Sequence, residues 1–94
     1  GIVTSSGTAE IEPMLVSSGV LEFLTVCVYG DSVKRLKPDP EPYRTALERL
    51  GVSTGVVLED SEAGLQSARG AGCEVIRVTD VALVPEQVRR RLLV

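Results

Sequence analysis

The stretch Val56-Val57-Leu58-Glu59-Asp60-Ser61-Glu62-Ala63-Gly64 is the part of the chain around which the predicted fold is organised. Its first three residues form a short continuous apolar run, the pattern of a strand buried on both faces. Glu59 and Asp60 follow directly, and Ser61 begins a segment with apolar residues at helical spacing, namely Leu65, Ala68 and Ala71. In a doubly wound α/β sheet, ligands bind outside the carboxyl ends of the strands, where this acidic pair would lie.

The acidic pair has two interpretations. Adjacent carboxylates need a counter-charge, and a hard divalent cation such as Mg²⁺ is the usual one, which predicts Glu59 and Asp60 as metal ligands. Alternatively, Asp60 or Ser61 only caps the N-terminus of the following helix and Glu59 is a solvated neighbour. The local sequence is compatible with both.

Outside this stretch the chain alternates between strand and helix patterns. Strands are predicted at residues 1–4, 25–29, 55–58 and 74–78. Helices are predicted on the face of Ile11, Met14 and Leu15, then over 40–50 after an N-cap at Asp39, over 61–71 and over 85–93. Strands separated by helices with short connections predict one α/β domain over residues 1–94, with a parallel sheet and right-handed crossovers.

Composition excludes several classes of function. The 94 residues are 44% hydrophobic and carry a net charge of −3, so no basic surface attracts nucleic acid. The chain contains no histidine, which excludes Ser-His or Cys-His catalysis within it, and it contains no apolar run of membrane-spanning length. Its two cysteines, Cys27 and Cys73, are interpreted as buried free thiols, which favours a reducing cytoplasm.

The chain begins without Met and within a predicted strand, which indicates a piece of a larger protein.

Polar residues follow three of the predicted strands. Thr4 and Ser5 follow the first strand, Lys37 lies in the loop after the second, and Glu59 and Asp60 follow the third. In a parallel sheet these three ends lie on one edge. A hydroxyl with loop amides can hold phosphoryl oxygens, a lysine can neutralise developing charge, and carboxylates can hold a metal ion. The combination predicts a phosphate site with Mg²⁺.

These residues also carry a family resemblance. Residues 1–6, 37–43 and 59–64 resemble, in order and spacing, the second, third and fourth motifs of haloacid dehalogenase (HAD) superfamily hydrolases, most closely the phosphatases and β-phosphoglucomutase-like members. By this resemblance Thr4 matches the phosphate-binding hydroxyl and Lys37 the lysine between phosphate and nucleophile. Glu59 and Asp60 match the Mg²⁺-binding acids. The resemblance implies the C-terminal half of a Rossmann-like, three-layer catalytic core with a parallel sheet.

The family's first motif, Asp-x-Asp-Gly-Thr, occurs nowhere in the 94 residues. In the family this motif supplies the nucleophilic aspartate and lies before a helical cap, which is also missing here. The resemblance therefore implies that the intact protein transfers phosphoryl groups of a small phosphorylated metabolite through an aspartyl-phosphate, as a phosphatase or phosphomutase. The isolated chain is predicted to be inactive.

The missing first motif also has a structural consequence. The family's first strand lies between the strands at 1–4 and 55–58, so the resemblance implies a gap there. We expect an N-terminal segment of the same protein, or a second copy of the chain, to fill this gap.

Two alternatives have different functions. The chain could be a non-catalytic HAD-like binding or interaction module that never had the first motif. A response-regulator receiver domain also combines an acidic pair, a hydroxyl and a lysine, but in the chain order acids, hydroxyl, lysine. The order here is hydroxyl, lysine, acids, which argues against it.

Overall fold

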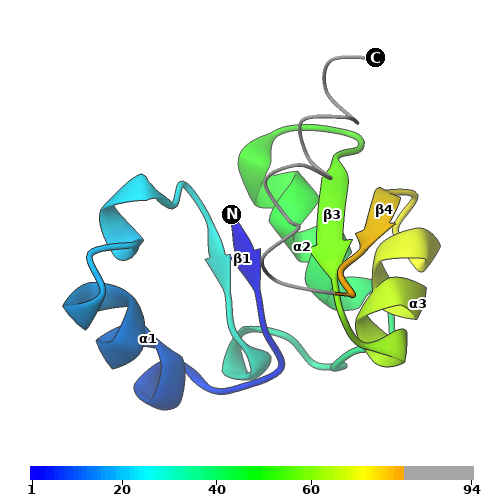
Figure 1. The fold of residues 1–94 in the computed structure, drawn as a ribbon. Helices are drawn as coiled ribbons and strands as arrows, with labels where there is room; N and C mark the ends of the chain where they lie inside the picture. The colour runs from blue at the N-terminus through cyan, green and yellow to red at the C-terminus, as the bar shows by residue number, and fades with distance from the viewer. Residues whose placement is uncertain (80–94) are drawn as a thin grey trace.

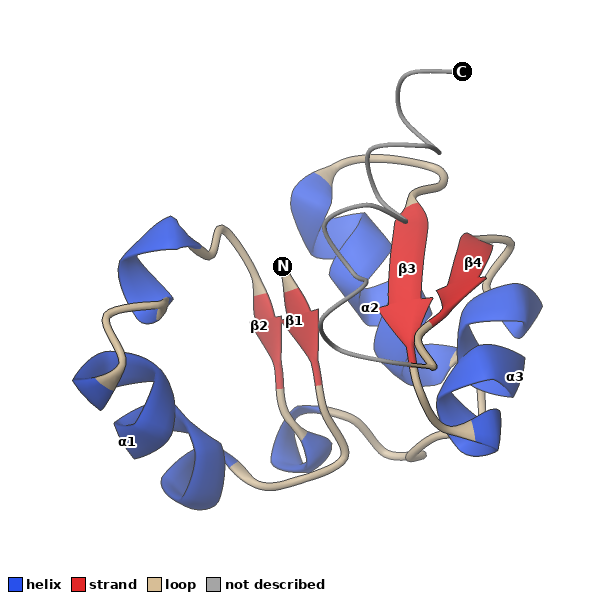
Figure 2. Cartoon of the chain, in the orientation of Figure 1, coloured by secondary structure: helices blue, strands red, loops and turns tan. Residues whose placement is uncertain are grey.

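The computed structural model describes residues 1–79, which form short parallel strands and helices in alternation (Figures 1 and 2). The strands are β1 (Ile2–Val3), β2 (Cys27–Val28), β3 (Val56–Glu59) and β4 (Glu74–Arg77). The helices are α1 (Thr8–Ser17), α2 (Glu41–Leu50) and α3 (Glu62–Gly70), with 3-10 turns η1 (Leu21–Phe23) and η2 (Gly30–Ser32). The helix predicted over 85–93 lies outside the described residues.

The strands form two separate parallel pairs. Strand β1 pairs with β2, with Ile2 opposite Cys27, and β3 pairs with β4, with Val56 opposite Glu74. The predicted α/β class and parallel pairing are therefore confirmed. Within residues 1–79, β1 and β3 are not hydrogen-bonded to each other, so each has an unpaired edge where the gap was expected (Figure 2).

Helix α2 connects the two strand pairs. Its residue Ala46 packs against Val26 and Val28 beside the first pair. Its residue Tyr43 packs against Ala68 of α3 and Cys73, which precedes β4. The partly buried side chain of Val3 contacts both clusters, so the halves share one core although their strands do not pair.

Local sequence explains the limits of α2. The backbone N–H of Glu41 donates to Oδ1 of Asp39 at 2.9 Å, and Gly51 ends the helix in the left-handed conformation with φ 71°. Asp39 therefore accepts the hydrogen bond expected of a cap, but the predicted N-cap position is wrong by one residue, because Pro40 is the N-cap and the regular helix begins at Glu41.

Two expectations about burial are wrong. Strand β3 was predicted to be buried on both faces, but Val56 and Leu58, which share one face, are 40% and 39% exposed, while Val57 contacts the core. In α1, Leu15 is buried but Met14 is 62% exposed. Helical and strand periodicity identifies a face, whereas its burial depends on what packs against that face.

The cysteines differ in burial. Both are free, and Cys73 is buried, as predicted, whereas Cys27 is only half-buried. Burial raises the pKa of the Cys73 thiol, which disfavours the reactive thiolate. The expectation of two buried thiols is thus wrong for Cys27, because its side chain lies in a short strand whose exposure alternates with the buried Val28.

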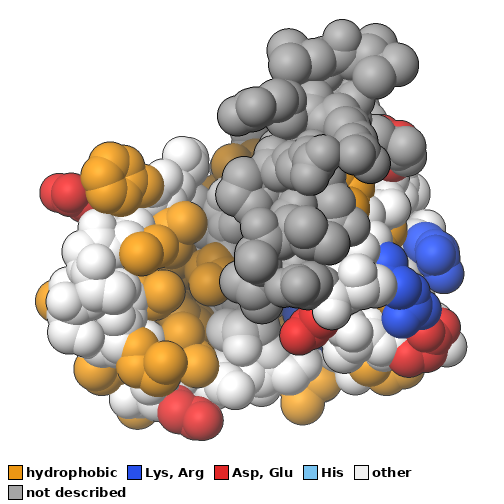
Figure 3. Space-filling view, viewed as in Figure 1, with side chains coloured by type: hydrophobic (Ala, Val, Ile, Leu, Met, Phe, Trp, Pro, Cys, Tyr) orange, Lys and Arg blue, Asp and Glu red, His pale blue; other side chains and the backbone are white. Residues whose placement is uncertain are grey.

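Apolar side chains remain exposed around α1 and η1. Met14, Val16 and Val20 are exposed, and Phe23 is the most exposed large apolar residue of the described chain, at 79%. Figure 3 shows apolar side chains gathered on the face between α1 and the β1–β2 pair.

No helix within residues 1–79 has both the length and the apolar character that a membrane span requires.

A distant residue caps α1. Asp31 in η2 accepts hydrogen bonds from the backbone N–H of Thr8 at 3.3 Å and from its hydroxyl at 2.8 Å. The N-terminal residue of the helix therefore depends on a loop that follows the second strand. A carboxylate at this position also interacts favourably with the helix dipole.

We predict that Asp31→Ala lowers the free energy of unfolding by about 1 kcal/mol, because Thr8 loses its capping acceptor. Urea unfolding of the complete gene product measures the change. Glu22→Ala is the matched control, since Glu22 is also exposed and makes no recorded hydrogen bond or ion pair within residues 1–79. Equal losses in both variants would contradict a capping role for Asp31.

Candidate functional site

A cleft of about 460 Å³ lies between β1 and β3. It is lined by residues 1–4, Lys37, Tyr43 and residues 56–60. The cleft brings together four of the five predicted site residues, namely Thr4, Lys37, Glu59 and Asp60. The fifth, Ser5, is exposed and does not line the cleft.

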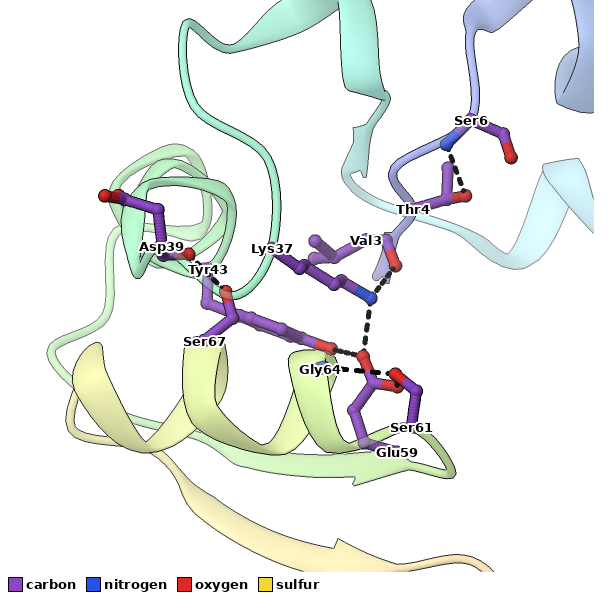
Figure 4. A network of polar contacts seen from close by, with 10 residues as sticks. All are labelled: Val3, Thr4, Ser6, Lys37, Asp39, Tyr43, Glu59, Ser61, Gly64 and Ser67. Carbon is purple, nitrogen blue, oxygen red and sulfur yellow. Dashed lines mark hydrogen bonds and ion pairs between the residues drawn. The ribbon is translucent and has the colours of Figure 1, made fainter.

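Lys37 is held at the edge of the cleft by residues from both strand pairs. Its Nζ donates to the backbone carbonyl of Val3 in β1 at 3.0 Å and forms an ion pair with Oε2 of Glu59 in β3 at 2.5 Å (Figure 4). The side chains of Lys37 and Glu59 are only 12% and 8% exposed. An ammonium group has three N–H donors, so beyond these two acceptors one donor is left for an anion within the described part of the chain.

Glu59 is the most connected side chain of the site. Its Oε2 also accepts a hydrogen bond from the hydroxyl of Tyr43 at 2.6 Å, and Ser61 Oγ lies 3.5 Å from its Oε1. Burial raises the pKa of Glu59, but hydrogen bonds from Lys37 and Tyr43 outweigh it, so the pKa is lowered overall. Glu59 is therefore a buried carboxylate that stays ionised. The alternative interpretation, in which Glu59 is only a solvated neighbour of a helix cap, is wrong for this residue.

The start of α3 is shaped around this carboxylate. Ser61 is the N-cap and accepts a hydrogen bond from the backbone N–H of Gly64 at 3.1 Å, so the capping interpretation of Ser61 is correct. A Cβ on Gly64 would lie 2.0 Å from the carboxyl carbon of Glu59. Glycine is normally unfavourable inside a helix, and here its lack of a side chain makes room for Glu59.

The loop after β1 is ordered by its own hydrogen bonds. Thr4 Oγ1 accepts the backbone N–H of Ser6 at 3.1 Å, which occupies one of the amides expected to face an anion. The hydroxyl hydrogen of Thr4 is still able to donate into the cleft. Gly30 lies against this loop, because a Cβ there would lie 2.1 Å from the carbonyl oxygen of Ser5. The loops after β1 and β2 are therefore in close contact.

The carboxylates fit part of a Mg²⁺ site. Asp60 is exposed and lines the cleft, and Oε1 of Glu59 lies 3.5 Å from Ser61 Oγ. Protein sites for Mg²⁺ commonly supply one or two carboxylates, with water and substrate phosphate as the other ligands. Within residues 1–79 no group of three or more His, Cys, Asp or Glu side chains is placed to hold a metal ion.

Sequence reasoning missed the role of Tyr43. Helical spacing placed it on the buried face of α2, and it is buried, at 7% exposure. Its hydroxyl nevertheless reaches Glu59, and its ring lies with its centroid 5.2 Å from Lys37 Nζ. The sequence did contain a signal, because the apolar face of this helix carries a tyrosine where a phenylalanine would pack equally well. A buried tyrosine hydroxyl needs a hydrogen-bond partner, which indicates a polar contact at this position.

Comparison with known proteins gives a consistent assignment. The family model described as haloacid dehalogenase-like hydrolase matches residues 1–78. The chain is 41% identical over 81 residues to validoxylamine A 7'-phosphate phosphatase of Streptomyces hygroscopicus subsp. limoneus, covering 84% of this chain and 38% of that protein. It is 41% identical over 78 residues to a plasmid-borne phosphoglycolate phosphatase of Cupriavidus necator, covering 81% of this chain and 34% of that protein. The chain thus spans little more than a third of these relatives.

A solved structure agrees with the sequence matches. CbbY from Rhodobacter sphaeroides, in complex with xylulose-(1,5)bisphosphate, is 36% identical to this chain with a TM-score of 0.71. The match covers 81% of this chain and 37% of CbbY. The HAD-like α/β fold that the motifs predicted is confirmed.

Proposed function

Because this chain belongs to the haloacid dehalogenase-like hydrolase family, we propose that it forms part of an enzyme that transfers the phosphoryl group of a small phosphate monoester, as a phosphatase or phosphomutase. The observation that carries the proposal is the position of Lys37. Its buried ammonium is fixed between Val3 and Glu59 at the edge of the cleft and retains a donor for a phosphoryl oxygen. The hydroxyl of Thr4 lines the same cleft.

Four of the five predicted site residues have a role in this proposal. Thr4 binds phosphoryl oxygens, and Lys37 neutralises the charge that develops on them, whereas Ser5 lies outside the cleft. Glu59 holds Lys37, and Asp60 with Glu59 contributes ligands for Mg²⁺. When bound, the metal stabilises negative charge on the phosphoryl group. The nucleophile would be an aspartate outside this chain, which attacks phosphorus and breaks the ester P–O bond, so that the alcohol leaves and takes up a proton. The resulting aspartyl-phosphate then passes its phosphoryl group to water in a phosphatase or to a hydroxyl of the sugar in a phosphomutase.

We also propose that a further polypeptide segment fills the gap in the sheet between β1 and β3 and leaves the end of the cleft at Thr4, Lys37 and Asp60 open for the phosphate group. The support is that, among residues 1–79, β1 and β3 each have an unpaired edge, and that Val56 and Leu58 on β3 are exposed. An N-terminal segment of the same protein or a second copy of the chain could supply a strand there. The mass of the native gene product in solution, compared with the mass of its single chain, distinguishes them. A second copy gives twice the mass of one short chain, whereas an N-terminal segment of the same protein gives a monomer with a longer chain.

The substrate is proposed to be a small phosphorylated metabolite. The names of two relatives specify phosphoglycolate and validoxylamine A 7'-phosphate, and CbbY was solved with a sugar bisphosphate. All are small molecules that present a terminal phosphate group. A cytoplasmic location, predicted from the two free cysteines, fits such a substrate and stays a prediction.

The test is an assay of the complete gene product against a panel of small phosphate esters, with Mg²⁺ and with a chelator. We expect hydrolysis or phosphoryl transfer only with Mg²⁺, and no turnover by the 94-residue chain alone. The second candidate is a non-catalytic HAD-like binding module that never had the Asp-x-Asp-Gly-Thr motif, and the presence of this motif in the complete gene product would decide for the enzyme. A gene product that binds phosphate esters without turning them over would establish that second candidate instead.

A further inference from the structure

Tyr43 contacts both members of the buried ion pair. Its hydroxyl donates to Glu59 Oε2 at 2.6 Å, and Lys37 Nζ lies 5.2 Å from the centroid of its ring (Figure 4). Tyr43 also lines the cleft. It is therefore the one residue of α2 that touches the group proposed to bind phosphate and the carboxylate that holds that group.

The ring of Tyr43 is itself firmly placed. Tyr43 packs in the core with Ala68 and Cys73, against partly buried residues that include Val3 and Val57. Val3 also supplies the carbonyl oxygen that accepts from Lys37. A rigid ring gives its hydroxyl a fixed position, because a tyrosine side chain has only two rotatable bonds before the ring.

The hydroxyl completes the restraint on Glu59. Oε2 of Glu59 receives donors from Lys37 and Tyr43. The backbone N–H of Asp60 also hydrogen-bonds the carboxylate, and Ser61 Oγ lies 3.5 Å from Oε1. Without the tyrosine hydroxyl the carboxylate would keep its ion pair but could rotate together with the flexible lysine. The position of the ammonium relative to the cleft would then be less well defined.

We propose that Tyr43 is a positioning residue of the phosphate site: its hydroxyl fixes the carboxylate of Glu59 and, through it, the ammonium of Lys37 at the edge of the cleft. The inference rests on the proposed function, since a phosphoryl group is the anion that Lys37 is proposed to bind. Tyr43 itself acts through its two neighbours and is assigned no step in the reaction.

The test uses Tyr43→Phe in the complete gene product. This substitution keeps the ring and its packing and removes only the hydroxyl. Tyr29→Phe is the matched control, because Tyr29 is equally buried, at 7% exposure, and its hydroxyl donates to Glu12 at 3.4 Å outside the residues that line the cleft. The readouts are the dissociation constant of inorganic phosphate by calorimetry, kcat for the best ester of the panel, and the unfolding temperature.

We expect Tyr43→Phe to weaken phosphate binding and to lower kcat, each by roughly 10-fold, which is the scale of one hydrogen bond to a charged group. Tyr29→Phe should change neither. Unchanged phosphate affinity and kcat in Tyr43→Phe, with or without a lower unfolding temperature, would overturn the inference, as would equal effects of the two variants. A wild type that binds no phosphate would also overturn it.

The outcome separates this inference from the proposed function. If the wild type binds phosphate but turns over no ester, the proposed function fails, and the phosphate affinities alone decide the role of Tyr43. If the wild type is active and Tyr43→Phe matches it in every readout, the proposed function stands and the positioning role is wrong.

Discussion

Replacing Lys37 with Met is expected to lower the free energy of unfolding by about 3–5 kcal/mol and to remove phosphoryl transfer, because it leaves the buried Glu59 carboxylate without its cation. Both side chains of this ion pair are largely buried, so water compensates only in part for the lost partner. Methionine has nearly the length of lysine, which keeps the loss of packing small. The change in stability therefore reports the unpaired charge.

The effect of Lys37→Met should depend on pH. In the wild type the pKa of Glu59 lies below its ordinary value of 4.5. As the pH falls, Glu59 is therefore protonated at a higher pH in the unfolded chain than in the folded protein. The stabilisation from Glu59 is therefore complete above about pH 4.5 and is lost as the pH falls below it. In the variant, burial is no longer opposed by Lys37 and raises the pKa, so acidification should narrow the difference in stability.

Urea unfolding of the complete gene product between pH 4 and pH 7, combined with the phosphate ester assay, measures these changes. Lys34→Met is the matched control, since Lys34 is exposed in the same loop and uses its backbone N–H, not its side chain, to contact Glu41. The control should keep wild-type stability and activity. A stability difference in Lys37→Met that stays constant with pH would show that the unpaired carboxylate is not its cause.

Replacing Gly64 with Ala is expected to destabilise the protein, although the same change inside most helices stabilises by roughly 1 kcal/mol. The new Cβ would lie about 2 Å from the Glu59 carboxyl group, which must move away. Moving it separates Glu59 from Lys37 and Tyr43, so we expect a net loss of about 2–3 kcal/mol, on the scale of a broken buried charge network. Phosphoryl transfer should fall with it, since Lys37 loses its anchor.

A double variant tests the cause. In Glu59→Ala the space opposite Gly64 is empty, so adding Gly64→Ala should be neutral or slightly stabilising. Unfolding measurements on the wild type, both single variants and the double variant give the coupling between the two positions. If Gly64→Ala costs the same with and without the Glu59 side chain, the close approach to the carboxylate does not explain the glycine.

Much of the fold was predictable because it depends on local rules. The alternation of apolar runs and helical spacing predicted the three helices and four strands that residues 1–79 contain, with boundaries within two residues wherever bounds were predicted. For α1 only a face was predicted, with Pro13 near the first turn, whereas the helix begins at Thr8 and contains Pro13 in its interior. Gly51 ends α2 in the left-handed conformation, as a glycine at that position indicates. Parallel pairing followed from the helical crossovers.

Part of the candidate site was predictable for a similar reason. Parallel strands place their carboxyl ends on one edge, so residues after different strands meet there without further information. Thr4, Lys37, Glu59 and Asp60 accordingly line one cleft. Ser5 does not, because the loop after β1 turns its carbonyl toward Gly30 and leaves the side chain exposed.

The sequence by itself therefore determined the order of the elements, the family and the residues at the strand ends, since these depend on spacing along the chain. Only the tertiary structure decided which of those residues hold one another. Lys37, Tyr43 and Glu59 meet across separations of 16 and 22 residues, because α2 packs on both strand pairs and turns Tyr43 toward β3. The exposure of β3 was decided in the same way, since burial depends on what packs against a face and not on the residues of the strand alone.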